Sequence, residues 1–281
     1  QASTRCRLCP QLGPQGIFDW PASSMRGTEH ALARWRAIAN CGRPKDSRHC
    51  LITSPWSAEN MISDTDMALR GALTQMIAEM GHAPSIRDLC ERVGNTPEEV
   101  EEALRRLHDA HALLLHPHEC RPWVVHPFAL SPGSCWVQTQ ERGYWANCLY
   151  CSFGVAAALR CDAVITTRIA GEVETVRYTI AGSRPNETED IFHLSTPAAR
   201  WWDNVIHACA SFQPFHKELD VDDWCSRHDM PKGAVMTIPA LWSFAQDWYG
   251  GYLETPWRKR SSAEARKLFA RHGLRSAFWA I

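Results

Sequence analysis

The sequence is organised around residues 144–154, which read YWANCLYCSFG and place two cysteines three positions apart between aromatic residues. The apolar run at residues 155–159 follows directly and favours a helix that begins near the first cysteine. On such a helix Cys148 and Cys151 share one face. A thiol in the first turn lies near the positive end of the helix dipole, which lowers its pKa and favours the thiolate. The alternative is that both are small buried residues without chemistry.

Composition and charge exclude several classes of function. The chain has 281 residues, with 30 basic and 31 acidic side chains and a net charge of −1, so its charge gives no reason to expect nucleic acid or an anionic membrane as a partner. No run approaches eighteen apolar residues, and no basic-then-apolar leader is readable. With 12 cysteines, the chain is therefore expected to be a thiol-rich cytoplasmic protein in which cysteines serve metal binding or catalysis.

Residues 1–62 form a poorly patterned N-terminal extension, in which only residues 29–39 have a helical pattern. Its four cysteines superficially resemble a zinc site: Cys6, Cys9, Cys41 and Cys50. The second pair is separated by many more residues than the two to four of a zinc ribbon, so a loosely ordered extension is the preferred interpretation.

Residues 63–125 predict a winged-helix-like unit. Apolar periodicity and capping residues indicate three helices, over residues 67–80, 85–93 and 96–107, and two short strands at residues 112–116 and 123–125. Such a unit often binds DNA through its third helix, which then carries basic and amide side chains. Here that helix begins with Glu98, Glu99, Glu101 and Glu102, opposed by Arg105 and Arg106 alone. A structural or lid-like role is therefore favoured over DNA recognition.

Residues 126–250 predict a mixed, β-rich domain with flanking helices, so the expected fold class is α+β. The pattern indicates a hairpin over residues 162–180, a strand over residues 201–212, a strand over residues 235–238, and helices at residues 220–228 and 239–249. Residues 251–281 form a basic amphipathic tail, expected to end in a solvated helix.

From about Met67 to Tyr249 the chain resembles the organomercurial (alkylmercury) lyases of bacterial mercury resistance. The resemblance rests on ordered motifs: the helical unit, Pro127-Phe128, Trp145 to Cys148, a second cysteine at Cys209 followed by Phe215, and Asp222-Asp223-Trp224. It implies a fold of the same kind and cleavage of carbon–mercury bonds.

The resemblance also implies site residues. Cys148 matches the family's first catalytic cysteine and Cys209 its second, while the position of the family's aspartate holds Cys151. A further family cysteine would fall near Arg168 or Ile169 and is absent. In the family, two thiolates hold mercury, a soft metal, and a proton delivered to carbon releases the hydrocarbon. Cys151 would then be the proton donor or a third metal ligand.

No organic cofactor is implied. The expected ligand is Hg(II) or another soft metal, the substrate is a small organometallic molecule, and the partners are cellular thiols, with neither nucleic acid nor membrane. The alternative function is a protein of the same fold that binds a soft metal, or performs another cysteine-based reaction on a small substrate, without carbon–mercury cleavage. The replacement of aspartate by Cys151 motivates it.

Other cysteine chemistries fit less well. A nitrile hydratase metal loop needs a third cysteine where this chain has Phe153, and a thioredoxin-like site needs a preceding strand in place of a proline-rich segment. His207 and His126 are candidate thiolate partners, although single histidines are more often structural. The remaining cysteines after residue 62 have no counterpart in the family pattern and are interpreted as packing residues: Cys90, Cys120, Cys135, Cys161 and Cys225.

Overall fold

The computed structural model describes residues 62–281. The described residues all belong to the second of the two units into which the chain divides, Thr53–Ile281. The helix expected at residues 29–39 and the cysteines Cys6, Cys9, Cys41 and Cys50 lie outside the described residues.

Three helices open the described part, in the predicted order: α2 (Asp64–Met80), α3 (Ile86–Val93) and α4 (Pro97–Asp109). Their ends follow local chemistry. Thr96 accepts a hydrogen bond from the Glu99 amide, and the Glu99 carboxylate accepts one from the Thr96 amide, which satisfies two amides that the helix leaves without partners. The three helices pack on one another, and α4 contacts the first strand of the sheet. The assignment of this unit as a winged helix stays a prediction.

The larger sheet has eight strands, all antiparallel, in the order β1-β2-β3-β5-β4-β6-β7-β8. The strands are β1 (Leu114–Leu115), β2 (Pro122–Val125), β3 (Phe128–Ala129), β4 (Cys135–Gln138), β5 (Gly143–Ala146), β6 (Ala163–Arg168), β7 (Thr175–Ala181) and β8 (Arg184–Pro185). The pairing of β6 with β7 confirms the hairpin expected from the alternating Val, Ile and Thr residues. A 3-10 turn, η3 (Ile169–Gly171), connects them.

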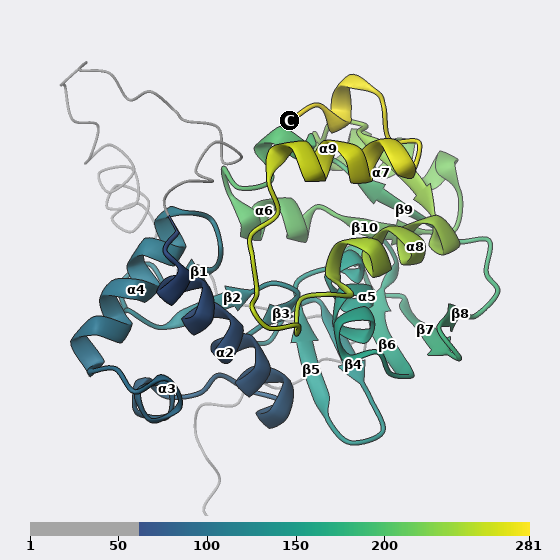
Figure 1. Ribbon diagram of the computed structural model, residues 1–281. Coiled ribbons are helices and arrows are strands. Elements are labelled where there is room, and N and C mark those ends of the chain that lie inside the picture. Colours follow the sequence, from purple (N-terminus) through teal and green to yellow (C-terminus); the bar gives the residue numbers. More distant parts are fainter. Residues whose placement is uncertain (1–61) are drawn as a thin grey trace, which may run out of the picture. The chain divides into compact units, whose positions relative to one another are not determined.

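The central helix is α5 (Leu149–Leu159), which packs between this sheet and helix α8 (Ile238–Tyr249) (Figure 1). Ten of its 11 residues are buried, which explains why its sequence is apolar on every face. A Cβ atom on Gly154 would lie 2.4 Å from the ring of Tyr249, so glycine is what allows the two helices to approach. Cys148 is the N-cap residue of α5, just before the first turn in which the sequence pattern had placed it.

A second, three-stranded antiparallel sheet has the order β10-β9-β11. Its strands are β9 (Ile191–Leu194), β10 (Gln213–Phe215) and β11 (Ala234–Thr237), and α7 (Glu218–His228) contacts β10. The mixture of helices and antiparallel sheets confirms the α+β class.

The strand expected over residues 201–212 is wrong. These residues follow a 3-10 turn, η4 (Ala198–Arg200), and form helix α6 (Val205–Ala210). The side-chain oxygen of Asn204 accepts a hydrogen bond from the His207 amide at 2.9 Å and caps this helix. The apolar, aromatic-rich run suggested a strand because it is too short to show helical periodicity.

The C-terminal segment differs from the solvated tail that the sequence suggested. It contains α9 (Ser262–Arg271) and the 3-10 turn η5 (Ala277–Trp279). Leu268 and Phe269 of α9 are buried, as are Trp257 and Trp279 on either side of it. The helix is amphipathic, and its apolar face packs into the main core. None of the described helices combines the length and apolar character that crossing a membrane requires.

Candidate functional site

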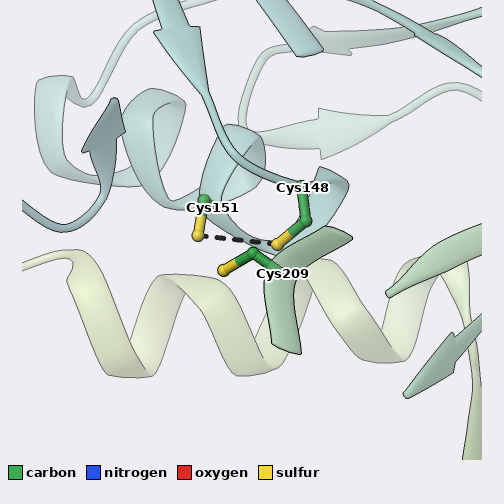
Figure 2. Close-up of side chains that lie close together, drawn as sticks. All are labelled: Cys148, Cys151 and Cys209. Carbon is green, nitrogen blue, oxygen red and sulfur yellow. Dashed lines mark hydrogen bonds between the residues drawn. The ribbon is translucent and has the colours of Figure 1, made fainter. Parts of the chain in front are cut away.

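Three cysteines that are distant in sequence come together at the start of α5. Cys148 caps the helix, Cys151 lies in its first turn, and Cys209 comes from α6. Their sulfur atoms all lie within 4.8 Å of one another, and those of Cys148 and Cys151 are 3.5 Å apart (Figure 2). Within residues 62–281 no other group of three or more Cys, His, Asp or Glu side chains is arranged to hold a metal ion. The structure therefore brings together all three site residues expected from the sequence.

The three thiols are buried and neutral. Relative exposure is 1% for Cys148, 1% for Cys151 and 6% for Cys209. Burial is the main cause that raises the pKa of Cys148 well above its ordinary value. Contact with Cys148 raises the pKa of Cys209, and burial adds to the rise. For Cys151 the hydrogen bond from Cys148 lowers the pKa, but contact with Cys209 and burial outweigh it, so this pKa is also well above the ordinary value.

The sequence-based expectation of a lowered cysteine pKa is therefore wrong. Cys148 is placed at the helix N-terminus as expected, but removal from water opposes the thiolate more strongly than the dipole favours it. Metal binding reverses this balance, because a soft cation displaces the thiol protons and neutralises the sulfur charges that form.

His126 lies against Cys151, with its Nδ1 3.6 Å from the sulfur. Burial, together with the charge of Arg70, lowers the pKa of His126 to about 4, so the imidazole is neutral at pH 7. The tautomer with its proton on Nε2 lets Nδ1 accept the Cys151 proton. A chain of hydrogen bonds then runs from Cys148 to Cys151 and on to His126.

Arg70 supports this arrangement from helix α2. It is 1% exposed, and its Nη2 donates to the backbone oxygen of His126 at 2.8 Å. Its Nε donates to the backbone oxygen of Ala112 at 3.3 Å, and Nη1 donates to Thr74. The guanidinium carbon lies 4.2 Å from the ring centre of Trp257. Burial lowers its pKa to about 10, which still leaves it charged at neutral pH.

The thiols open onto a cavity of about 90 Å³. Its walls are mainly aromatic, from Tyr150, Trp201, Trp202, Phe212, Trp248, Tyr249, Tyr252 and Trp257. The charged side chains that line it are Arg70, Lys259 and Arg260, and no Asp or Glu of the described residues lines it. The cavity thus combines soft ligand atoms, an apolar wall and positive charge.

The two histidines proposed as thiolate partners lie in different positions relative to the cysteine cluster. His126 contacts Cys151, whereas His207 is exposed and turned away from the cavity wall that Cys209 forms. The separation follows from the helical structure of α6, because residues two apart share a face on a strand but not on a helix.

The remaining cysteines take no part in the cluster. Cys135 is buried with its sulfur 3.2 Å from Thr167 Oγ1, Cys120 donates to a backbone oxygen of α4, and Cys225 lies 4.0 Å from His193 Nε2. All eight cysteines of the described residues are free thiols. The interpretation of these other cysteines as packing residues stays a prediction.

Sequence reasoning missed the cavity residues Arg70, Tyr150 and Trp257. One signal was readable in the sequence. Arg70 lies three positions after Met67 and three before Leu73, in the apolar stripe of α2, where a charged residue is rarely buried without a binding partner. The contribution of Trp257 and Arg260 could not be read from the sequence, because it depends on how the C-terminal segment packs.

Comparison with known proteins identifies a family match over the segment that contains the cysteine cluster. Residues 128–250 match the family model of alkylmercury lyase, MerB, and this segment includes all three clustered cysteines. The resemblance found in the sequence is thereby confirmed. A search of curated proteins gave no match.

A solved structure described as the mercury-bound form of MerB2 is similar in fold. The TM-score is 0.56 at 16% sequence identity, and the alignment covers 69% of this chain and 94% of that one. At this identity the similarity shows the fold and leaves the chemistry to be argued from the site itself.

Proposed function

We propose that this protein is an organomercurial lyase-like enzyme that cleaves carbon–mercury bonds by thiolate-assisted protonolysis. One observation carries the proposal: three buried thiols within 4.8 Å of one another line a cavity, inside the segment that matches the alkylmercury lyase family. Thiolates are the preferred ligands of soft metals, and a set of three in an apolar cavity suits an organomercury cation.

The reaction begins with exchange of ligands on mercury. The substrate arrives as R–Hg–SR′, in which R′S is a cellular thiolate. One thiol of the pair Cys148 and Cys209 forms a sulfur–mercury bond, and its proton leaves on the displaced R′SH. Because the cysteines are neutral before this step, the exchange needs no charge to be buried in the cavity.

Cleavage then uses a second thiol proton. The electron pair of the carbon–mercury bond goes to carbon, which takes the proton of Cys151 and leaves as R–H. Hg(II) remains on the first sulfur and on the newly formed Cys151 thiolate, and the third cysteine stays protonated beside them. Two protons thus leave with R′SH and R–H, so atoms and charge balance. His126 orients the Cys151 S–H bond through Nδ1.

A second candidate function is retention of a soft metal without cleavage. It is favoured by the absence of any Asp or Glu among the described residues that line the cavity, and by Cys151 at the position where the family has its aspartate. A third sulfur ligand would also hold Hg(II) more tightly and slow its release.

The deciding experiment is gas chromatography of the headspace over purified protein with methylmercury and excess thiol. Methane formed over many turnovers supports the lyase. Stoichiometric uptake of mercury without methane overturns cleavage and supports the second candidate. The variants Cys148→Ser and Cys209→Ser are expected to lose methane release, with Cys161→Ser, outside the cavity, as the matched control. Full activity in either of the first two contradicts the proposal.

A further inference from the structure

The cavity beside the thiols contains hydrogen-bond donors that have no acceptor. The hydroxyl of Tyr150 and the Nε1–H of Trp257 are buried, and neither has a hydrogen-bond partner among the described residues. Both residues line the cavity, at 4% and 5% exposure. Indole nitrogen can only donate, and a buried donor without an acceptor is costly, so each such group needs an explanation.

Positive charge gathers around the same donors. Arg70 uses three of its five N–H groups on the neutral oxygen atoms of Ala112, Thr74 and His126. Arg260 donates to the backbone oxygens of Trp248 and Asp247. Among residues 62–281, no carboxylate lies within ion-pair distance of either arginine. Arg70 is the buried one of the two, and a buried charge without a counter-ion is costly, so an anionic ligand at Arg70 would offset this cost.

The two observations converge at Trp257. Its ring lies under the Arg70 guanidinium, at 4.2 Å from the guanidinium carbon to the ring centre, and its own N–H lacks an acceptor. Lys259, two residues further along, lines the same cavity. Two hydrogen-bond donors without an acceptor and the Arg70 guanidinium therefore line the same cavity, where α2, α5 and the C-terminal segment meet, and no Asp or Glu of the described residues lines it.

We propose that this wall is a carboxylate-binding subsite, in which Arg70, Trp257 and Tyr150 donate hydrogen bonds to a carboxylate on the molecule that carries mercury into the cavity. The inference rests on the proposed function, because the ligand reaches the thiols as an organomercury–thiolate adduct. The carboxylate can belong to the displaced thiol or to the organic group on mercury. Planar guanidinium suits carboxylate geometry, and charge-assisted hydrogen bonds are about twice as strong as neutral ones.

The test compares matched pairs of small ligands, because the cavity is small. In the first arm methylmercury is presented as its adduct with 3-mercaptopropanoate or with the neutral 3-mercaptopropanamide. In the second arm the thiol is neutral and the organic group is 2-carboxyethyl or 2-carbamoylethyl. The rate of mercury transfer to the protein is followed by near-ultraviolet absorbance of the sulfur–mercury bond, and the carboxylate-to-amide ratio is recorded in each arm.

The variants Trp257→Phe and Tyr150→Phe each remove one donor and keep the aromatic ring. Each is expected to lower the carboxylate-to-amide ratio by about tenfold in one arm, the size of one charge-assisted hydrogen bond. Comparing ratios between proteins cancels the intrinsic difference between the two ligands. The matched control is Trp123→Phe, which removes an indole donor outside the cavity and is expected to leave the ratio unchanged.

The outcomes separate this inference from the proposed function. If the variants lower the carboxylate-to-amide rate ratio in the first arm, the recognised carboxylate belongs to the displaced thiol. If they lower it in the second arm, it belongs to the organic group on mercury. Unchanged ratios in both arms, with mercury still transferred, overturn the subsite and leave the proposed function standing. No transfer from any ligand overturns both. A measurement on the unaltered protein guards against misfolded variants: propanoate should slow transfer, and propanamide at equal concentration should not.

Discussion

The sulfur of Cys151 lies 3.6 Å from Nδ1 of His126, so the thiol that the family resemblance places at the aspartate position faces a neutral imidazole. The same sulfur accepts the hydrogen bond of Cys148. Cys151 is thus oriented from both sides, by a donor and by an acceptor, and its own proton has a defined direction. A carboxylate at this position would instead bring a negative charge into a cavity that has none of its own among the described residues.

Replacement of Cys151 distinguishes a proton donor from a metal ligand. In Cys151→Ser the hydroxyl is a far weaker acid and a poor ligand for a soft metal, so methane release is expected to fall at least about a hundredfold, the range typical of losing a general acid. In Cys151→Asp release is expected to persist, because a carboxylic acid can supply the same proton. Headspace chromatography measures methane release in both variants, and the mercury retained after desalting measures the loss of a metal ligand. Unchanged methane release in Cys151→Ser would exclude Cys151 as the donor.

Burial of His193 should make the protein sensitive to acid. Its pKa is lowered from 6.5 to about 4, chiefly by burial, so between these values the unfolded chain binds a proton that the folded chain does not. The free energy of unfolding is therefore expected to fall as the pH drops from about 6.5 to about 4, by on the order of 3 kcal/mol from this group. Denaturant titrations across this range measure it.

The variant His193→Gln keeps an acceptor for the Gly233 amide and removes the titration, so its stability should depend less on pH over the same interval. His118→Gln, an exposed position, is the control. Equal pH dependence of His193→Gln and the unaltered protein would show that His193 does not carry the effect.

Gly154 is expected to tolerate no side chain. The Cβ atom of Gly154→Ala would lie 2.4 Å from the ring of Tyr249, which forces α5 and α8 apart and costs about 1–3 kcal/mol of stability. Because Tyr249 also lines the cavity, mercury binding should weaken together with stability. Thermal unfolding measures the change, and Ser243→Ala at an exposed position of α8 serves as the control. A melting temperature within one degree or so of the unaltered protein would contradict the close approach of the two helices.

The helical unit is expected not to recognise DNA. Both arginines of α4 are engaged by carboxylates, Arg105 by Glu101 at 2.9 Å and Arg106 by Asp66 through two hydrogen bonds. Glu98 and Glu102 on the same helix are exposed. A helix with this charge repels phosphate, so gel-shift assays at physiological salt should show no complex. Sequence-specific binding would instead support a regulatory function for this unit.

Part of the secondary structure of this protein could be predicted from short-range sequence signals. Capping residues such as Ser85 and Thr96, and alternation in the β6–β7 hairpin, each act within a few residues, so the elements they specify could be read directly. The same holds for Cys148 and Cys151, which their spacing places at the N-cap and in the first turn of one helix. For Cys209, only the family resemblance joined it to the other two.

Tertiary structure decided the rest, because the deciding interactions join distant residues. Cys209 reaches the cluster through a short helix capped by Asn204, where the aromatic pattern had suggested a strand. Burial of the thiols, which raises the pKa of Cys148, depends on packing from α8 and the C-terminal segment. Trp257 stacks on Arg70 across most of the chain's length. The sequence by itself determined which ligand atoms are present and where α5 begins; the tertiary structure determined that the atoms meet, that they are neutral, and that positive charge surrounds them.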